Sequence, residues 1–98
     1  MTAHGRPTVE HHPERSRYEL VIDDEVVGIA DYHMGDEGAL VFPHTQIDPS
    51  HRGQGLGAVL VAGALDDVRA RGARVIPRCW YVAQYIHDHP EHHDLLAP

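Results

Sequence analysis

The chain has 98 residues, which is enough for one small domain built around a single hydrophobic core. Its formal net charge is −7 with histidine neutral, so the chain would repel a phosphate backbone and a nucleic-acid-binding role is disfavoured. No apolar run reaches the roughly 20 residues that cross a membrane, and the first residues lack a secretory signal pattern. We therefore expect a cytoplasmic protein without a membrane partner. The single cysteine, Cys79, excludes an intrachain disulfide.

Residues 1–16 contain two prolines, a glycine and three histidines, with little apolar periodicity. We expect most of this segment to be a flexible leader and residues 17–98 to form the domain. His4, His11 and His12 belong to a residue type that binds transition metals, but no fourth ligand lies at a suitable spacing. A solvated tail is expected instead of a metal site.

Runs of β-branched residues then predict an antiparallel meander. The expected strands cover residues 18–22, 26–33, 39–42 and 44–47, and the last two ranges form one or two strand pieces. An acidic turn joins the first two strands into a hairpin, and a glycine-rich turn precedes the third. Pro43 has no backbone N–H, so we expect a kink or a bulge where it interrupts the strand pieces.

A helix is predicted from about Gly53 to Arg71, because apolar residues recur at three- and four-residue spacing. A short strand over residues 74–77 follows, and then a second helix from Cys79 to about His89. Four antiparallel strands followed by a helix, a strand and a helix indicate an α+β layer structure.

The loop that opens the first helix carries the clearest chemical signal. It contains three glycines, which let backbone N–H groups approach a bulky anion closely. The helix start adds unpaired N–H donors and a partial positive charge, so the two together predict a pyrophosphate site. Arg52 can add a salt bridge from the rim. The loop reads Arg52, Gly53, Gln54, Gly55, Leu56, Gly57.

Three other interpretations of this loop were weighed. A P-loop needs Gly-Lys-Ser/Thr at its end, and Ala58 follows Gly57 here. A dinucleotide-binding Rossmann loop needs Gly-x-Gly-x-x-Gly after a parallel strand, and neither the spacing nor the predicted meander fits. The glycines can also serve only a tight turn and close helix packing, and the sequence leaves that alternative open.

These features resemble the GNAT acetyltransferase superfamily, whose acetyl-coenzyme A loop has the pattern Arg/Gln-x-x-Gly-x-Gly/Ala. Arg52, Gly55 and Gly57 match it in register, and the order of predicted elements matches from Tyr18 to His89. Two further stretches narrow the resemblance to the minimal single-domain group that contains the N-acetyltransferase domain-containing 1 proteins. They are His44-Thr45-Gln46-Ile47 and Cys79-Trp80-Tyr81-Val82-Ala83-Gln84-Tyr85.

The resemblance implies a compact GNAT-like fold that binds acetyl-coenzyme A as acyl donor. It places Gln46 and Ile47 beside the pantetheine arm, with the thioester in a gap between that strand and the next one. The superfamily's last helix usually carries a Tyr that protonates the leaving thiolate, and Ile86 occupies that position here. Tyr85 lies one residue earlier, roughly 100° around the helix, and is the candidate to contact the cofactor sulfur.

Cys79 is the candidate nucleophile, because a helix start beside Arg78 favours a thiolate that accepts the acetyl group. The alternative is that Cys79 is a small buried residue. His44 is the candidate general base, with an ordinary strand histidine as the alternative. Asp31 and His33 share one face of the neighbouring strand and can orient His44 or contact the acceptor, although solvent-facing residues are the commoner case.

The last predicted helix and the residues after it carry Trp80 and four histidines. Trp80 is expected to anchor the short helix by packing. The histidines resemble a metal cluster in composition only, because Pro90 breaks the helical register, so no metal site is expected. They are His87, His89, His92 and His93.

The sequence thus predicts an acetyl-coenzyme A-dependent N-acetyltransferase that moves an acetyl group to an amine acceptor, through Cys79 or directly. The acceptor is a small molecule or a protein segment, bound in a shallow, open cleft. The alternative is a non-catalytic coenzyme A-binding sensor or accessory module, which the missing helix Tyr favours.

Overall fold

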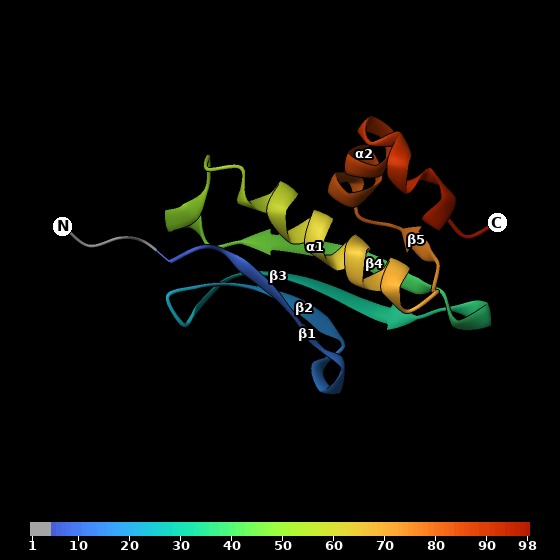
Figure 1. Cartoon of the computed structure of the whole chain (residues 1–98), viewed down its shortest axis with the longest axis horizontal. Coiled ribbons are helices and arrows are strands. Elements are labelled where there is room, and N and C mark those ends of the chain that lie inside the picture. Colours follow the sequence, from blue (N-terminus) through green and yellow to red (C-terminus); the bar gives the residue numbers. More distant parts are fainter. Residues whose placement is uncertain (1–4) are drawn as a thin grey trace.

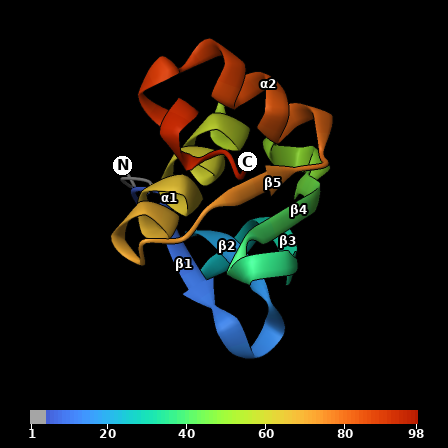
Figure 2. The ribbon, with the colours of Figure 1, turned by 90° about the vertical axis from the view of Figure 1, so that its right-hand side faces the viewer.

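The computed structural model describes residues 5–98, which form one five-stranded sheet with two helices on the same side of it (Figures 1 and 2). The strands follow the order β1-β2-β3-β4-β5, with the first four antiparallel and β5 parallel to β4. The α+β GNAT-like fold expected from the sequence is therefore confirmed. None of the helices in residues 5–98 is both long and apolar enough to cross a membrane.

The helices and strands have the following bounds. They are β1 (Thr8–His12), β2 (Arg17–Ile22), β3 (Glu25–Met34), β4 (Leu40–Ile47), α1 (Leu56–Ala70), β5 (Val75–Pro77) and α2 (Trp80–Asp88). Four short 3-10 turns lie between them or after them: η1 (Pro13–Arg15), η2 (Asp36–Gly38), η3 (Pro49–His51) and η4 (Pro90–Leu95).

The first strand corrects the expectation of a flexible leader over residues 1–16. Residues 8–12 form β1, which pairs antiparallel with β2 along its whole length. Val9 and His11 point inward, and the His11 ring stacks on Tyr18 at a centroid distance of 4.4 Å. The sequence pattern missed this strand because a histidine takes the place of an aliphatic residue on its inner face. His4, which we had assigned to the same tail, lies outside the described residues.

Pro43 produces the bulge that its missing N–H predicts. Asp31 pairs with His44 and His33 pairs with Val41, so two residues of β4 oppose one residue of β3. Residues 40–47 form one continuous strand, which is one of the two arrangements that the sequence left open.

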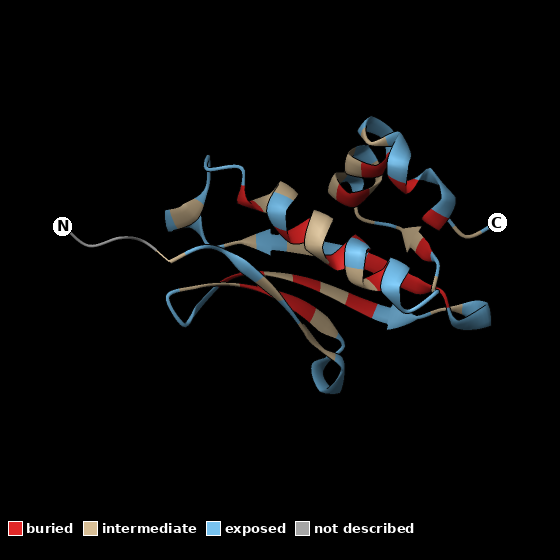
Figure 3. Cartoon of the chain, in the orientation of Figure 1, coloured by how far each residue is buried: buried red, intermediate tan, exposed pale blue. Residues whose placement is uncertain are grey.

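The core lies between α1 and the sheet (Figure 3). Tyr18, Leu20 and Phe42 of the strands and Leu60 and Leu65 of α1 are its largest fully buried members. Their burial fixes α1 across the sheet, so the loop before α1 lies at a defined end of β4.

β4 and β5 separate after a short paired stretch. They pair only from Leu40↔Val75 to Phe42↔Pro77. The backbone N–H groups of Arg78 and Cys79 then both donate to the Phe42 carbonyl, at 3.1 and 2.8 Å, and the chain turns into α2. Within the described residues, β4 beyond this point has β3 on one side and no strand on the other. We call this stretch, His44–Ile47, the free edge of β4.

Candidate functional site

An open cavity of about 700 Å³ lies between the free edge of β4, the glycine loop and the start of α2. Most of the residues singled out from the sequence line it, whereas Gln54 and Tyr85 do not. The lining residues are His44, Thr45, Gln46, Ile47, His51, Arg52, Gly53, Gly55, Leu56, Gly57, Cys79, Trp80 and Tyr81.

The glycine loop has a backbone conformation that suits glycine and an open space beside it. Gly53 and Gly55 have φ angles of 82° and 73°, in the left-handed region. A Cβ added at either position would meet no atom within 4 Å, so the space beside them is open. Their left-handed conformation also explains why α1 begins at Leu56 and not at Gly53, as the sequence pattern suggested.

The start of α1 offers donors to a ligand. Gly55 is its N-cap residue and provides no side-chain hydrogen bond, so the N–H groups of the first turn are not capped by that residue. The helix dipole adds partial positive charge at the same place. Within the described residues, this uncapped helix start at the edge of an open cavity is suited to bind an anion.

The turn before the loop is held by local hydrogen bonds. The Asp48 carboxylate accepts from the Ser50 N–H and hydroxyl at 3.0 and 2.9 Å, and these bonds lower the pKa of Asp48. The Arg52 Nε atom donates to the Ile47 carbonyl at 3.4 Å. The exposed Arg52 guanidinium is thereby tied to the end of β4 and lies on the cavity rim.

The free edge of β4 presents different side chains to the two faces of the sheet. Thr45 pairs with the buried Ala30, so its side chain points to the helix-covered face, and alternation sends His44 and Gln46 to the other face. His44 Nε2 lies 3.2 Å from Gln46 Oε1, and both side chains are exposed. Asp31 lies directly opposite His44 on β3, whereas the bulge separates His33 from that pair.

Cys79 is the N-cap residue of α2 and is half-buried. Its thiol donates to Thr45 Oγ1 at a sulfur–oxygen distance of 3.6 Å. Its carbonyl accepts from the Ala83 N–H at 3.0 Å, which closes the first turn of the helix. The sulfur therefore lies where β4, β5 and α2 meet, on the wall of the cavity.

The helix that follows shows why the usual Tyr position is not usable. Ile86 is 1% exposed and belongs to the hydrophobic core, as does Val82. The neighbouring Tyr85 stacks on His89 with ring centroids 3.9 Å apart, outside the cavity. Tyr85, which the sequence suggested as the contact to the cofactor sulfur, therefore does not line the cavity.

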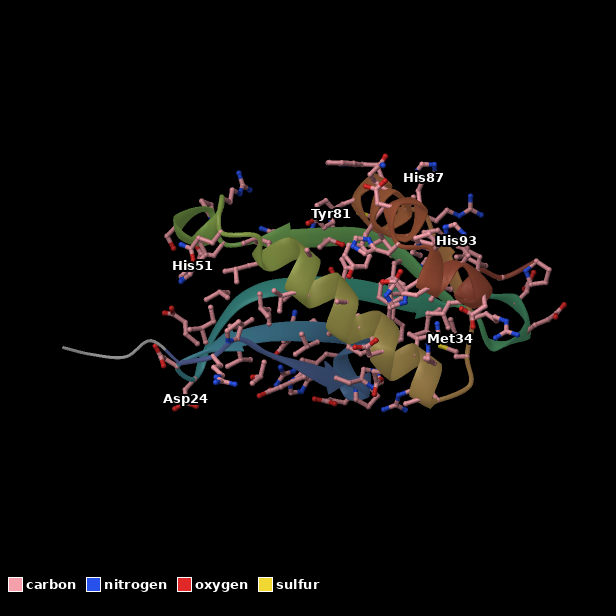
Figure 4. All side chains as sticks on the ribbon, turned by 45° about the horizontal axis from the view of Figure 1, so that its top comes forward. Asp24, Met34, His51, Tyr81, His87 and His93 are labelled. Atoms are coloured by element: carbon pink, nitrogen blue, oxygen red, sulfur yellow. The ribbon has the colours of Figure 1, made fainter. Side chains whose placement is uncertain are left out.

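Tyr81 is a site residue that the sequence analysis did not assign. A Cβ placed on Gly57 would lie 2.7 Å from the Tyr81 hydroxyl, so this hydroxyl rests against the first turn of α1. Figure 4 shows Tyr81 on the side of α2 nearest the start of α1. Its signal in the sequence was its position two residues after Cys79, on the first turn of the same helix.

Trp80 contradicts the prediction that it anchors α2 by packing. Its side chain is 76% exposed, and it meets the Tyr81 ring edge-on at a centroid distance of 5.7 Å. The anchoring role belongs instead to Val82 and Ile86, which are buried. An exposed indole on the rim of a cavity is available to a ligand.

A further cluster of metal-ligand residue types, Glu10, His12 and Glu19, lies on the sheet face away from the helices. Their ligand atoms fall within 4.8 Å of one another. However, Arg15 and Arg17 donate to the Glu19 carboxylate, each at 2.8 Å, and these guanidinium groups would repel a cation. Although burial opposes it, these hydrogen bonds lower the pKa of Glu19. The cluster is an ion-pair network, and His12 is part of it and not of a solvated tail.

Comparisons with known proteins agree with this geometry. A family model described as GCN5-related N-acetyl-transferase matches residues 17–95. Protein NATD1 of the mouse is 27% identical over 89 residues, which cover 88% of this chain and 79% of that protein. The span of the family match runs from β2 through η4 and includes every residue that lines the cavity.

Proposed function

Because the chain belongs to the GCN5-related N-acetyltransferase family, we propose that it transfers an acetyl group from acetyl-coenzyme A to an amine acceptor. The observation that carries this proposal is one continuous cavity that joins an uncapped helix start to the Cys79 thiol along the free edge of β4. An anion site and a nucleophile at the two ends of one cavity suit a phosphate-bearing thioester.

The residues that would hold the cofactor are those of the loop and of the free edge. The backbone N–H groups of residues 53–57 would bind the pyrophosphate, with Arg52 adding a charged contact. The unpaired backbone of Gln46 and Ile47 would bind the amide-rich pantetheine arm, as an added strand would. The open space beside Gly53 and Gly55 supports this fit.

Cys79 would carry the acetyl group in a covalent route. Its sulfur forms a bond to the acetyl carbonyl carbon while the bond from that carbon to the coenzyme A sulfur breaks. Cys79 lies at the start of α2 with its side chain on the wall of the cavity, where the thioester would reach it. The Thr45 hydroxyl beside the sulfur can then donate to it.

Tyr81 and His44 would handle the protons. The Tyr81 hydroxyl would donate a proton to the departing coenzyme A thiolate and would then regain a proton from water. The acceptor nitrogen then bonds to the acetyl carbon, Cys79 leaves as a thiolate, and the proton of the nitrogen passes to His44. Both residues line the same cavity as Cys79. In direct transfer, His44 would deprotonate the amine in the same way and Cys79 would only contact the thioester.

A second candidate function is a coenzyme A-binding sensor or accessory module without turnover. The burial of Ile86, where the superfamily's general acid stands, favours it. The presence of Cys79, His44 and Tyr81 on one cavity opposes it.

Mass spectrometry of the intact protein after incubation with acetyl-coenzyme A separates these functions. We expect an acetyl adduct that is absent from Cys79→Ala and persists in Ser50→Ala, a control outside the cavity lining. Release of coenzyme A dependent on an added amine, without an adduct, would indicate direct transfer. Cofactor binding with neither adduct nor release would establish the module.

A further inference from the structure

A second, smaller groove lies on the outer surface of α2, next to the cavity. It has a volume of about 130 Å³ and shares Trp80 and Tyr81 with the cavity, so the two adjoin. We call it the aromatic groove. Its lining residues are Trp80, Tyr81, Gln84, Tyr85, Asp88 and His89.

We propose that the aromatic groove binds an organic ammonium group and is the acceptor subsite, so that the acceptor is a linear diamine or polyamine. The proposal rests on the proposed acetyltransferase function for the acceptor role, but the cation site itself does not depend on it.

One end of the groove is a half-buried, stacked pair of rings, and the other end is an exposed indole. The Tyr85 ring stacks on His89, whose Nδ1 donates to the Tyr85 carbonyl at 2.7 Å. At the other end, Trp80 is 76% exposed and packs only edge-on against Tyr81. Leaving so much indole surface in water forgoes the hydrophobic free energy of burying it. A ligand that covers Trp80 would recover that free energy.

The charge in the groove selects a cation. Gln84 Nε2 donates to Asp88 Oδ1 at 3.0 Å, and this bond, with one from His87, lowers the pKa of Asp88. The carboxylate is therefore ionised at neutral pH. Burial raises the pKa of Tyr85, and the nearby negative charges of Glu91 and Asp66 raise it further. These charges indicate a negative field around the Tyr85 ring.

Aromatic faces beside a carboxylate form the environment in which organic ammonium groups bind. The Asp88 carboxylate would also repel a phosphate group, so the groove is unsuited to the charged end of coenzyme A. The net charge of −7 also attracts a cationic acceptor to the protein.

The acceptor class follows from the distance between the groove and the cavity. An amine that attacks a thioester must be uncharged, so the ammonium in the groove must be a second nitrogen of the same molecule. Trp80 and Asp88 are eight residues apart on α2, or about 12 Å along the helix axis. A linear alkyl chain with amino groups can extend from Asp88 past Trp80 toward Cys79.

Trp80 is the only tryptophan of the chain and lines both the groove and the cavity, so its fluorescence reports on a ligand bound in either, and the variants below assign the site. We would titrate the protein with hexane-1,6-diamine and, as an uncharged analogue of the same length, with hexane-1,6-diol. The diamine should change the Trp80 emission saturably and the diol should not. Equal changes with both compounds would overturn the proposal.

Two isosteric variants test the carboxylate. Asp88→Asn should weaken diamine binding at least fivefold, because it removes the charge and keeps an acceptor for Gln84. Asp24→Asn removes the same charge from the turn between β2 and β3, far from the groove in Figure 4, at a φ of 65° that Asn tolerates. Its affinity should equal that of the unmodified protein. Equal weakening by the two variants would show only a general charge effect and overturn the site.

Titrations of coenzyme A followed by calorimetry distinguish this inference from the proposed function. Saturating diamine should leave the affinity for coenzyme A unchanged, since the two occupy different parts of the surface. Competition would assign the groove to the cofactor and overturn its acceptor role. Diamine binding without any coenzyme A binding would overturn the proposed function and leave the cation site standing.

Discussion

The Cys79 Sγ atom lies 3.6 Å from the Thr45 Oγ1 atom, which joins the start of α2 to the free edge of β4. Thr45 points to the helix-covered face because it pairs with the buried Ala30, and Cys79 reaches it because the Phe42 carbonyl holds the turn after β5. The contact between Cys79 and Thr45 therefore lies at the point where β4 and β5 separate. It also means that a hydroxyl is in place to stabilise negative charge on the sulfur.

Thr45→Val should slow the alkylation of Cys79 by iodoacetamide. Valine keeps the shape of threonine but loses the hydroxyl that can donate to a thiolate, a loss of about 1 kcal/mol or about fivefold in rate at pH 7. Mass spectrometry of the intact protein follows the reaction at the single cysteine. Thr8→Val, an exposed threonine on β1, is the matched control. Equal rates in the two variants would show that the hydroxyl does not act on the sulfur.

Gly55→Asp and Gly55→Asn form a matched pair that tests the anion site. Both residues tolerate the left-handed conformation, and a Cβ here meets no atom within 4 Å. Only the charge differs, so Asp should bind coenzyme A at least about tenfold more weakly than Asn. Calorimetry measures both affinities. Equal values would place the pyrophosphate elsewhere.

Tyr81→Phe should lower kcat with little effect on the affinity for coenzyme A, because it removes only the hydroxyl that we propose as proton donor. General acid catalysis contributes about 100-fold or more, so a fall of that order is expected. The ring that packs against Gly57 remains, and the fold should be unaffected. Tyr32→Phe, which removes a hydroxyl that contacts His11 and lies outside both the cavity and the aromatic groove, should retain kcat. A similar loss in both variants would remove Tyr81 from the proton transfer.

The contribution of His11 to the stability of the protein should fall as the pH falls below about 6.5. Burial and the nearby Arg71 lower the pKa of His11, so protons bind more tightly to the unfolded chain, and stability present above pH 6.5 is lost below it. His12 acts in the opposite direction, since Glu10 raises its pKa. The contribution of His11 must therefore be measured by difference.

The free energy of unfolding is measured by denaturant titration for His11→Phe and for the unmodified protein, each at pH 7.5 and at pH 5. The fall in this free energy between the two pH values is then compared between the two proteins. His11→Phe keeps the ring stacked on Tyr18 and should show a smaller decline. His33→Gln, at an exposed position on β3, should decline as much as the unmodified protein. A parallel decline in all three would show that His11 does not titrate with unfolding.

The sequence predicted the parts of the site that depend on local pattern. The meander, the bulge at Pro43 and the loop with Gly53 and Gly55 follow from β-branched runs, a missing N–H and backbone freedom, all of which act within a few residues. These features locate the cavity, since a helix must start at the loop and the strand before it must end there.

The parts that were missed depend on contacts between distant segments. β1 was overlooked because its inward residue His11 gains its burial from Tyr18 and Asp67, which lie elsewhere in the sequence. Tyr81 and Tyr85 sit four residues apart on one helix, and only the packing of Val82 in the core decides which of them reaches the cavity. A helical pattern fixes the spacing of side chains but not the rotation of the helix against its neighbours.

The contact between β1 and α1 predicts that Gly63→Ala destabilises the protein, whereas helix propensity alone would predict that it stabilises. In an exposed helix, Gly→Ala stabilises by about 1 kcal/mol. At Gly63, however, an added Cβ would lie 2.7 Å from Val9 Cβ and 2.5 Å from Val9 Cγ2, so β1 or the helix must shift. Overpacking of this kind costs about 1–3 kcal/mol, and Gly63→Ala should therefore destabilise the protein.

The double variant Val9→Ala, Gly63→Ala tests the cause of this loss. Val9→Ala removes the two Val9 methyl groups, of which Cγ2 is the atom nearest to the new Cβ, but keeps the Val9 Cβ atom at 2.7 Å. Gly63→Ala should therefore be less destabilising in the Val9→Ala background than alone, while remaining destabilising. Ala62→Gly on the same helix, a half-buried neighbour, is the control for propensity, and its effect should be the same in both backgrounds. Denaturant unfolding of the three single variants, the two double variants and the unmodified protein gives the coupling free energy between Val9 and each helix position. A coupling free energy near zero would show that β1 does not pack against Gly63 in solution, and that residues 8–12 do not belong to the folded sheet.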